Sequence, residues 1–384
     1  MRPASTRTPR PLLARALPTV ALAVVTALSA ACASRSPARC PPCASAPLSP
    51  EPQTADALAL SLPLLPAWSL KYVGTPSADT PRLDIDAVIA RHGLRRDQAV
   101  ELQNHFFDLR RAAPTAEPQS QFDAALQRAR EDRFEDRRDL KSLREREFIV
   151  VFDLDDTLYD QYRASADCHD LVVEPPGGAP RYIKFAPGWD AAIRQIHKLG
   201  GAVALFSANL DDNVLQNTGA WRLDNTPLRD HPSVAGVLSN SHLVQQSAAP
   251  LIQGDKRRAP IMEASKDLRI FDPTLTRVII VDDNPIRLFQ LRNTRVTKKF
   301  HADRYCQGDA QERAAHDQVL PTVVRELEES ITYARANKVD FATAYLPYSA
   351  LGQLTARALI DGGLAPAEAI DRIRRQPELV EDSY

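Results

Sequence analysis

The sequence lacks an excess of charge of either sign, and it is poor in glycine and in aromatic residues. Its 384 residues include 48 lysines and arginines against 49 aspartates and glutamates, only 14 glycines, and 6% aromatic side chains. The scarcity of glycine excludes a collagen-like chain, and a hydrophobic content of 44% excludes a wholly disordered one. The first 31 residues carry four arginines and no acid, so the remainder has 44 basic residues against 49 acidic ones. That remainder lacks the broad basic surface that nucleic-acid binding needs, and we expect no nucleic-acid partner.

The amino terminus has the order of a secretory signal. Basic residues come first, and the apolar run that follows, from Val20 to Ala31, is too short for the ~20 residues of a membrane-spanning helix. We therefore predict that residues 1–31 are an export signal that takes no part in the fold. The residues LSAAC that end at Cys32 resemble a bacterial lipobox, although Leu28 stands one place further from the cysteine than in that pattern. The resemblance implies lipidation of Cys32 and a membrane lipoprotein of the cell envelope, with ordinary cleavage or an uncleaved anchor as alternatives.

Residues 32–81 are rich in proline and have no sustained apolar period, which predicts an extended tether. The tether contains the pair Cys40 and Cys43. No second CxxC pair follows, and no predicted strand or helix flanks this one, so an incidental or oxidised pair is favoured over a redox or zinc site. Cys168 and Cys306 can pair in an oxidising compartment, but the sequence does not show whether they lie close together.

Helical segments are predicted on both sides of the centre of the chain, over residues 82–147 and 310–384. In the first segment, apolar residues between 83 and 111 recur at spacings of three and four and predict two helices with a glycine between them. The densely charged stretch 122–146 is predicted to be a solvated helix rather than a docking surface. In the second segment, prolines and a glycine pair are expected to divide the chain into several helices. They either pack on the core or bind a partner.

Three near-continuous apolar runs predict the core. They begin at Phe148, Val203 and Val278, and each ends in polar residues. Strands of a parallel sheet that is covered on both faces have this pattern. Residues 187–201, with a proline before a helical period and two glycines after it, supply a crossover helix. We predict a doubly wound, Rossmann-like α/β core with a parallel sheet over residues 148–309, in which ligands bind at the carboxyl ends of the strands.

Carboxylates stand at the ends of two of these runs. Because side chains alternate along a strand, Asp153 and Asp155 should emerge on the same side, and Asp156 should point elsewhere. One carboxylate of such a pair can attack as a nucleophile while the other moves protons. Asp282 and Asp283 end another run and can complete an oxygen-ligand site for Mg²⁺. The alternative is that Asp153 and Asp155 only cap a turn after the strand.

A hydroxyl and an ammonium group complete the candidate site. Ser207 can donate a hydrogen bond to a phosphoryl group, and Lys266 can neutralise its charge. Lys256 competes with Lys266 for this role, and spacing favours Lys266. Trp189 and Trp221 are expected to pack inside the protein rather than to bind substrate.

The motifs that contain these residues resemble a known superfamily. DLDDTLYD at 153–160 is similar to the first motif of the haloacid dehalogenase (HAD) superfamily, whose phosphatases use DxDx(T/V). FSAN with Ser207, KDL with Lys266 and VIIVDDNP ending at Pro285 resemble the second, third and fourth motifs, in the same order. The layout is most similar to the NLI-interacting-factor or TFIIF-associated carboxy-terminal-domain (CTD) phosphatase branch. In that branch a proline-glycine helix leads into a strand ending FTAS, and KDL precedes a strand ending VDNSP. The resemblance covers residues 148–300.

The resemblance implies a role for each motif residue. Asp153 is the nucleophile that forms an aspartyl-phosphate, Asp155 is first the acid and then the base, and Thr157 orients the loop that carries the acid. The residues implied to bind the substrate phosphate are Ser207, Ala208, Asn209 and Lys266. The residues implied at the Mg²⁺ site are Asp153, Asp155 through its backbone carbonyl, and Asp283 with support from Asp282.

The chain departs from the branch at three places. Ser207 stands where the branch has threonine, and Asp283 stands where it has asparagine, so a hydroxyl and a metal ligand are kept. The stretch after Asp160 lacks the branch's usual sequence, which leaves the identity of the substrate open. Residues 160–186 are too few for the large cap domain of many superfamily members. We therefore expect a small or absent cap and an open site that admits phosphorylated protein segments.

The predicted function is Mg²⁺-dependent hydrolysis of phosphomonoesters through an aspartyl-phosphate. Phosphoserine or phosphothreonine in proteins is slightly preferred over a small molecule as the substrate. The alternative is a catalytically degraded HAD-like lipoprotein that serves as a binding module.

Overall fold

The computed structural model describes residues 71–72, 81–132, 142–162, 168–245 and 264–380. All of them belong to the unit Gln53–Tyr384. Several predictions lie outside the described residues: the export signal 1–31, the lipidated Cys32, the pair Cys40 and Cys43, nearly all of the tether 32–81, and the alternative Lys256. Within the described ranges, no helix is both long enough and apolar enough to cross a membrane.

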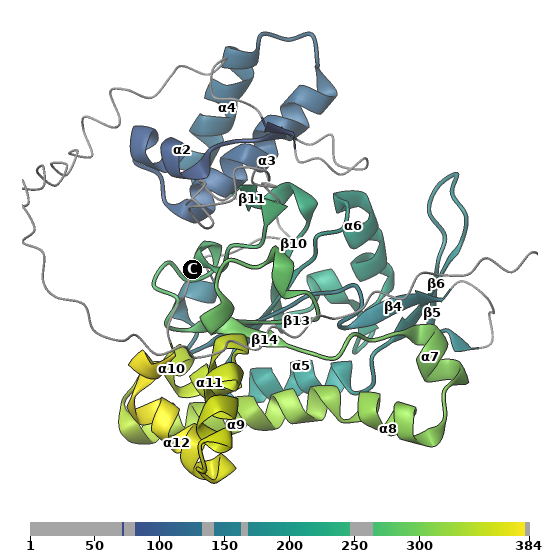
Figure 1. Ribbon diagram of the computed structural model, residues 1–384. Helices are drawn as coiled ribbons and strands as arrows, with labels where there is room; N and C mark the ends of the chain where they lie inside the picture. Colours follow the sequence, from purple (N-terminus) through teal and green to yellow (C-terminus); the bar gives the residue numbers. More distant parts are fainter. Residues whose placement is uncertain (1–70, 73–80, 133–141, 163–167, 246–263, 381–384) are drawn as a thin grey trace, which may run out of the picture. The chain divides into compact units, whose positions relative to one another are not determined.

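A five-stranded parallel sheet forms the centre of the fold (Figure 1). Its strands in chain order are β3 (Ile149–Phe152), β7 (Ala202–Phe206), β10 (Val234–Leu238), β13 (Val278–Asp282) and β14 (Thr294–Val296). Their order across the sheet is β10-β7-β3-β13-β14, and every neighbouring pair is parallel. The predicted Rossmann-like α/β core is therefore confirmed. The apolar pattern does not reveal β10, whose pairing shifts register near Gly236, or β14, a three-residue strand at the edge of the sheet.

Both faces of this sheet are buried, which explains why its strands are apolar throughout. The helices that share an apolar cluster with its strands are α2 (Ile85–His92), α3 (Arg96–Ala112), α4 (Pro118–Arg130), α5 (Trp189–Lys198), α6 (Asp211–Ala220) and α9 (Val319–Asn337). In β3, Ile149 and Val151 belong to one apolar cluster with α2, α3 and α4. The alternate residues Val150 and Phe152 belong to a second cluster with α5, α6 and α9. β3 thus contributes to two cores on opposite sides of the sheet.

The crossover helix before β7 ends at the predicted glycine pair. Gly200 adopts a φ of 93°, which a residue with a side chain rarely does. A Cβ at Gly201 would lie 2.5 Å from the ring of Phe148, so only glycine lets the chain pass this close to the start of the first strand. The two glycines bring the chain from α5 back into the sheet beside β3.

The amino-terminal helices agree with the predicted pair over residues 83–111. Gly93 separates α2 from α3 with a φ of 63°. The prediction of one solvated helix over 122–146 is wrong in the described part, because α4 ends at Arg130 and a 3-10 turn occupies Ser142–Glu145. The charged stretch also contains apolar side chains, among them Phe122 and Leu126, and these are buried. Here tertiary packing of an amphipathic face outweighs the charge pattern.

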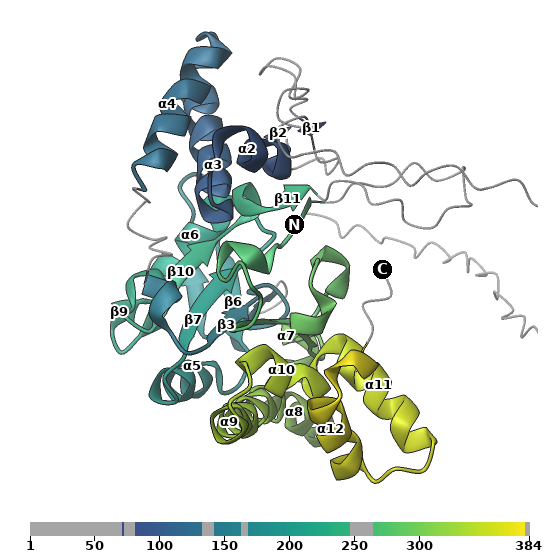
Figure 2. The same cartoon turned by 90° about the vertical axis from the view of Figure 1, so that its left-hand side faces the viewer.

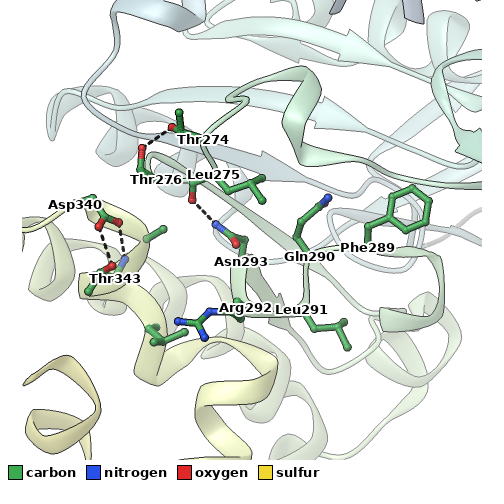
Figure 3. Close-up of a pocket in the computed structure, with 12 residues that line it drawn as sticks. Thr274, Leu275, Thr276, Phe289, Gln290, Leu291, Arg292, Asn293, Asp340 and Thr343 are labelled. Atoms are coloured by element: carbon green, nitrogen blue, oxygen red, sulfur yellow. Dashed lines mark hydrogen bonds between the residues drawn. The ribbon is translucent and has the colours of Figure 1, made fainter. Parts of the chain in front are cut away.

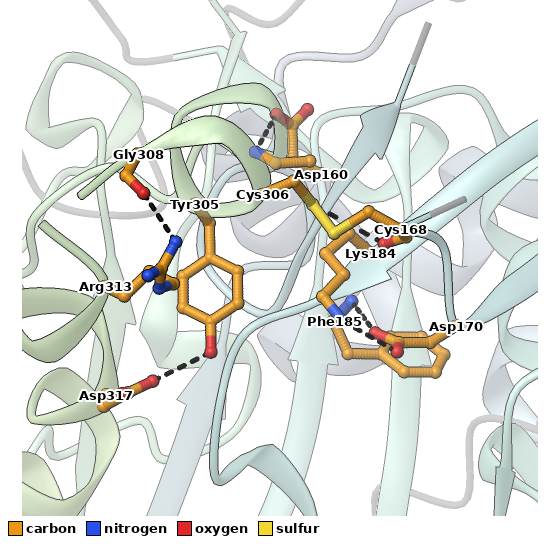
Figure 4. The surroundings of a disulfide bond; sticks show 11 residues. Asp160, Cys168, Asp170, Lys184, Phe185, Tyr305, Cys306, Gly308, Arg313 and Asp317 are labelled. Carbon is orange, nitrogen blue, oxygen red and sulfur yellow. Dashed lines mark hydrogen bonds and ion pairs between the residues drawn. A yellow bond between two sulfur atoms is a disulfide. The ribbon is translucent and has the colours of Figure 1, made fainter. Parts of the chain in front are cut away.

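A small antiparallel sheet follows the first strand. It consists of β4 (Tyr159–Tyr162), β5 (Leu171–Val173) and β6 (Arg181–Phe185), paired in the order β4-β6-β5. It occupies the interval that the sequence marks as too short for a large cap, and we call it the cap sheet. Figure 4 shows the disulfide that joins Cys168, just before β5, to Cys306 in α7 (Ala302–Gln307). This bond ties the cap sheet to the helix that follows β14.

The carboxy-terminal segment packs on the core. Its helices are α8 (Ala310–Asp317), α9, α10 (Phe341–Tyr345), α11 (Ala350–Asp361) and α12 (Pro366–Arg375), and Figure 2 shows α10, α11 and α12 gathered beside α9. One of the expected breaks at a proline, that at Pro321, falls three residues earlier, at Gln318 between α8 and α9. The proline itself lies in the first turn of α9, where its missing N–H is not needed. The expected stop at the glycine pair is confirmed, because Gly362 ends α11.

Three two-stranded antiparallel pairs complete the described strands. They are β1 (Lys71–Tyr72) with β2 (Pro81–Arg82), β8 (Arg222–Leu223) with β9 (Thr226–Pro227), and β11 (Val244–Gln245) with β12 (Ala264–Ser265). The pair β11 and β12 places the third motif, which begins directly after β12, beside the carboxyl edge of the central sheet.

Candidate active site

The predicted site residues meet at the carboxyl edge of the central sheet. Asp153 follows β3, and its N–H donates to the carbonyl of Val281 in β13. Ser207 follows β7, and its N–H donates to the carbonyl of Leu238 in β10. Asp282 is the last residue of β13. The parallel order of the strands thus brings residues more than a hundred positions apart to one edge.

Lys266 lies between two carboxylates. Its Nζ is 2.8 Å from Asp153 Oδ1 and donates to Asp282 Oδ2 at 2.7 Å. The three residues are almost completely buried, with Lys266 and Asp282 each 1% exposed. The predicted choice of Lys266 as the site lysine agrees with this position. Because its ammonium lies beside Asp153, Lys266 can contact a phosphoryl group only when that group also lies next to Asp153.

Burial and charge act in opposite directions on this group. Burial raises the pKa of Asp153 well above its usual range, and the ammonium of Lys266 only partly offsets this effect. Burial by itself would lower the pKa of Lys266, but the charges of Asp153 and Asp282 outweigh it and raise that pKa. Lys266 therefore stays charged at neutral pH, between two buried carboxyl groups.

Asp155 is held by the loop that follows β7. Ser207 Oγ donates to Asp155 Oδ2 at 2.8 Å, and Asn209 Nδ2 donates to Asp155 Oδ1 at 3.1 Å. The N–H of Asn209 in turn donates to Ser207 Oγ at 2.9 Å. The two carboxylates of the DxD motif thus have different partners: Asp153 faces an ammonium, and Asp155 faces a hydroxyl and an amide. Such a difference suits a nucleophile and a proton carrier.

The next two residues link this loop to its surroundings. Asp156 has a φ of 62° and forms an ion pair with Lys299, so it points away from Asp153 as predicted. Thr157 Oγ1 accepts a hydrogen bond from the N–H of Asp283 at 3.1 Å and lies 3.4 Å from Asp283 Oδ1. Thr157 therefore ties the turn that carries Asp155 to the end of β13.

Three carboxylates form a group that fits a divalent cation. Each of Asp153, Asp282 and Asp283 offers one oxygen, and these oxygens lie within 4.8 Å of one another. Oxygen ligands of this kind suit Mg²⁺. Both oxygens of Asp282 already accept hydrogen bonds, from Lys266 and from the N–H of Asn284 at 2.8 Å. Asp153 and Asp283 each keep one carboxylate oxygen without a hydrogen bond among the described residues, and Asp282 does not, so Asp153 and Asp283 are the better candidates to bind the ion.

A second group of titratable residues lies next to the site. Asp156, Asp160 and His301 could also approach one ion. Lys299 already pairs with Asp156, and Asp160 Oδ2 accepts the N–H of Ala302 at 2.9 Å. These contacts account for the group as part of the connection between the cap sheet and α7.

Tyr159 is a buried neighbour of the site that the motif pattern does not single out. Its ring is 1% exposed, and its hydroxyl accepts a hydrogen bond from Asn217 Nδ2 at 2.9 Å. Burial, followed by the nearby charge of Asp155, raises the pKa of Tyr159 well above its usual range. Its position within the first motif, DLDDTLYD, is the sequence feature that could have identified Tyr159 as a neighbour of the site. The two tryptophans pack as expected: Trp221 is 1% exposed, and Trp189 lies 4.6 Å from it between ring centroids.

A cavity of about 460 Å³ lies away from these residues. Figure 3 shows it lined by Thr274 and Thr276, which precede β13, and by Asn293, which precedes β14. These positions mark the amino edge of the sheet, opposite to the carboxyl edge. The cavity is therefore not part of the candidate active site.

Comparison with known proteins places the centre of the chain in a family. Residues 148–329 match the family model described as NLI interacting factor-like phosphatase. This match extends beyond residue 309 into α9, which packs on the sheet. No curated protein matches the chain.

Several solved structures also match. One is Fcp1, titled an essential RNA polymerase II CTD phosphatase, at 16% identity and a TM-score of 0.29, over 62% of this chain and 63% of that one. Another is a variant of the fission yeast RNA polymerase II CTD phosphatase Fcp1 bound to beryllium fluoride. It has 14% identity and a TM-score of 0.26, over 58% of this chain and 67% of that one. The chain thus spans 63% of the length of the first of these structures. The family match, with its four motifs at one edge of a Rossmann-like sheet, identifies residues 148–329 as an NLI interacting factor-like phosphatase domain of the HAD type.

Proposed function

We propose that this domain hydrolyses phosphomonoesters in two steps, with Asp153 as the nucleophile. In the first step, a carboxylate oxygen of Asp153 attacks phosphorus, the bond from phosphorus to the ester oxygen breaks, and Asp155 gives its proton to the leaving alcohol. In the second step, Asp155 takes a proton from water, the water oxygen attacks phosphorus, and the bond to Asp153 breaks. Inorganic phosphate is released, and both carboxylates return to their starting states.

The observation that carries this proposal is the different setting of the two carboxylates. Within the described part of the chain, the contacts of Asp153 use Oδ1, which accepts from the N–H of Leu154 and lies beside Lys266. Oδ2 is therefore the oxygen available for attack. Asp155 is fixed by Ser207 and Asn209 rather than by a cation, so it can exchange a proton. Lys266 is placed to balance the charge of a phosphoryl group bound next to Asp153.

We propose Mg²⁺ as the cofactor, held by the side chains of Asp153 and Asp283 and by the backbone carbonyl of Asp155. When bound, the ion supplies positive charge beside the phosphoryl oxygens. Asp282 holds Lys266 in place, and Thr157 holds Asp283. We assign these roles because both oxygens of Asp282 accept hydrogen bonds, whereas Asp283 is partly exposed.

The substrate we propose is phosphoserine or phosphothreonine in a protein segment. The cap sheet has only three short strands, between Tyr159 and Phe185. A cap of this size leaves room for a bulky substrate, whereas a small metabolite gains little from an open site. A panel of phosphopeptides and sugar phosphates tests this choice, and higher kcat/KM for a sugar phosphate than for every phosphopeptide would refute it.

We also propose that the chain is exported and held at a membrane by a lipid on Cys32, with residues 32–81 as the tether. The basic, apolar and small-residue order of the first 31 residues supports this proposal. Metabolic labelling with a fatty acid should mark the wild-type chain and not the Cys32→Ala variant. Equal labelling of the two would rule out this anchor.

The test of the reaction uses the full chain with 4-nitrophenyl phosphate and Mg²⁺. Asp153→Asn should abolish turnover and prevent trapping of beryllofluoride. Asp190→Asn is the matched control, because Asp190 is an exposed carboxylate on α5 paired with Arg194, and it should keep wild-type activity. Full activity in Asp153→Asn would refute the proposed nucleophile.

Asp155→Asn separates the two steps. An aryl phosphate has a leaving group that needs little help from an acid, so the first step should still occur. The second step needs a base, so the variant should release about one equivalent of nitrophenol in a burst and accumulate phosphoenzyme. A uniform slow release without a burst would contradict this assignment. A wild-type chain without turnover or trapping on any phosphoester would favour the binding-module alternative.

A further inference from the structure

Arg82 is a buried cation outside the phosphatase domain. It ends β2, shortly before α2 begins at Ile85, and it is 0% exposed. Its Nη2 donates to the carbonyl oxygen of Asn240 at 2.6 Å and to Asn240 Oδ1 at 2.7 Å. Burial lowers the pKa of Arg82 to about 10, and the charge of Asp211 opposes this shift, so Arg82 remains charged at neutral pH. A buried charge is costly to keep, which raises the question of what this one holds.

Asn240 passes this contact on to the loop of the second motif. It begins a 3-10 turn, η6 (Asn240–His242), that follows β10. Its Nδ2 donates to the carbonyl of Ala208 at 3.0 Å, and its N–H donates to the carbonyl of Asn209 at 2.9 Å. Asn240 thus accepts from Arg82 on one side and donates twice to the loop on the other.

The loop 207–209 is the one that holds Asp155. Ser207 and Asn209 donate to the two oxygens of that carboxylate. A continuous chain of hydrogen bonds therefore runs from Arg82 through Asn240 to the loop and on to the proposed acid. Both bonds from Arg82 to Asn240 come from the one nitrogen Nη2, which carries two N–H groups, so each of the two oxygens can accept one of them.

Other contacts from the amino-terminal segment reach the same region. Gln103 Nε2 in α3 donates to the carbonyls of Ser241 at 2.9 Å and Leu243 at 3.2 Å, directly after Asn240. Arg96 Nη1 donates to Asp267 Oδ2 at 3.0 Å, next to the site lysine. The amino-terminal segment therefore contacts the turn that holds the second motif and a residue of the third motif.

We propose that Arg82 is a positioning residue for the phosphatase domain and orients the loop 207–209 through Asn240. This proposal rests on the proposed function for its effect on turnover, and on the hydrogen bonds alone for its effect on the loop. Arg82 does not touch the reacting atoms. It sets the geometry in which Ser207 and Asn209 hold Asp155.

The experiment compares three variants of the full chain. Arg82→Met removes the guanidinium at similar length, and Arg82→Lys keeps the charge without the planar fork. Arg110→Met is the matched control, because Arg110 donates to Ala116 and Gln121 near the amino-terminal helices and, among the described residues, has no hydrogen bond to the loop. Kinetics with 4-nitrophenyl phosphate and phenyl phosphate, and hydrogen exchange of backbone amides, are measured for each.

Arg82→Met should lower kcat about 10- to 100-fold, because a small displacement of a catalytic group has an effect of that size. The loss in kcat/KM should be greater for phenyl phosphate, since its leaving group depends more on the acid. Amide exchange should rise in the peptides that contain residues 206–210 and 238–243, and not across the whole domain. Arg82→Lys should recover part of the activity, and Arg110→Met should behave as wild type in these measurements.

The outcomes separate the two proposals. If the wild-type chain has no phosphatase activity but Arg82→Met still raises exchange in the loop, the proposed function fails and the positioning role stands. If Arg82→Met keeps wild-type kcat and exchange, or loses activity equally with both substrates alongside a general rise in exchange, the positioning role is overturned. If Arg82→Met does not fold, Arg82→Lys decides. A selective loss in that variant supports the proposal, and wild-type behaviour refutes it.

Discussion

Replacing Lys266 by methionine tests the electrostatic core of the site. The substitution keeps the length of the side chain and removes the ammonium that lies 2.8 Å from Asp153 and 2.7 Å from Asp282. These carboxylates are 7% and 1% exposed, so water cannot replace the lost partner. Removing one member of a buried ionic group in this way lowers the free energy of unfolding by about 3–5 kcal/mol.

A matched surface pair shows how much of this effect comes from burial. Lys184 Nζ lies 2.9 Å from Asp170, nearly the same distance, but the two side chains are 18% and 35% exposed. Exposed pairs contribute about 0–1 kcal/mol, so Lys184→Met should change the free energy of unfolding by no more than that. The difference between the two variants measures the effect of burial at constant chemistry.

The stability loss in Lys266→Met should also depend on pH. Burial already raises the pKa of Asp153, so the folded state holds a proton there more tightly than the unfolded chain does. Stability contributed by such a group is present at low pH and falls as pH rises above the usual carboxyl range. In Lys266→Met the ammonium that lowers the pKa of Asp153 is gone, so the pKa of Asp153 should rise further. The pH range over which stability falls then extends higher, and the variant should lose more stability at about pH 8 than at about pH 5.

The assay is urea denaturation of the full chain with a chelator present, followed by fluorescence at both pH values. The double variant Lys266→Met with Asp282→Asn removes one charge of each sign, so it should recover part of the stability without recovering turnover. A loss below about 1 kcal/mol at the higher pH would show that Lys266 is not the partner of a buried charge. A loss that does not change with pH would refute the role of ionised carboxylates.

Three further measurements test other parts of the structure. Raising the pH from about 5 to about 8 should lower the Mg²⁺ concentration that half-saturates turnover, because burial and neighbouring carboxylates raise the pKa of Asp283 and protons compete with the metal; a constant value would contradict this. Changing both Cys168 and Cys306 to serine should lower the free energy of unfolding by about 2–4 kcal/mol without reductant. A reductant should then weaken only the wild type, and equal stability of the two oxidised proteins would argue against the bond. Trp221→Ala should cost about 3–5 kcal/mol because the indole is 1% exposed. Leu354→Ala, at a side chain 70% exposed, is the control and should change stability by less than about 0.5 kcal/mol.

Much of the core and the order of the motifs could be predicted from the sequence because both are encoded locally. The three apolar runs correspond to β3, β7 and β13, and the polar residues after them meet at one edge as parallel strands require. Strands β10 and β14 were not predicted, because a glycine interrupts the apolar run of β10 and β14 has only three residues. A pattern of three residues, as in β14, does not differ from that of a loop.

The contacts between distant segments could not be predicted. Arg82 and Asn240 are 158 positions apart, and neither stands in a motif. The position of Lys266 between Asp153 and Asp282 follows from the path of β12 rather than from the letters KDL. The pairing of Cys168 with Cys306 likewise depends on where α7 returns to the cap sheet. In each case tertiary folding brings together residues whose local sequence is compatible with other partners.

The disulfide also makes the polypeptide a closed ring over part of its length. The ring runs from Cys168 to Cys306, so it contains Lys266 and Asp283. The proposed nucleophile Asp153 lies outside the ring, in the chain that precedes Cys168. A protease that cuts the chain once inside the ring opens it without releasing either piece. The two halves of the catalytic apparatus would remain covalently connected, and they would separate on a gel only after reduction.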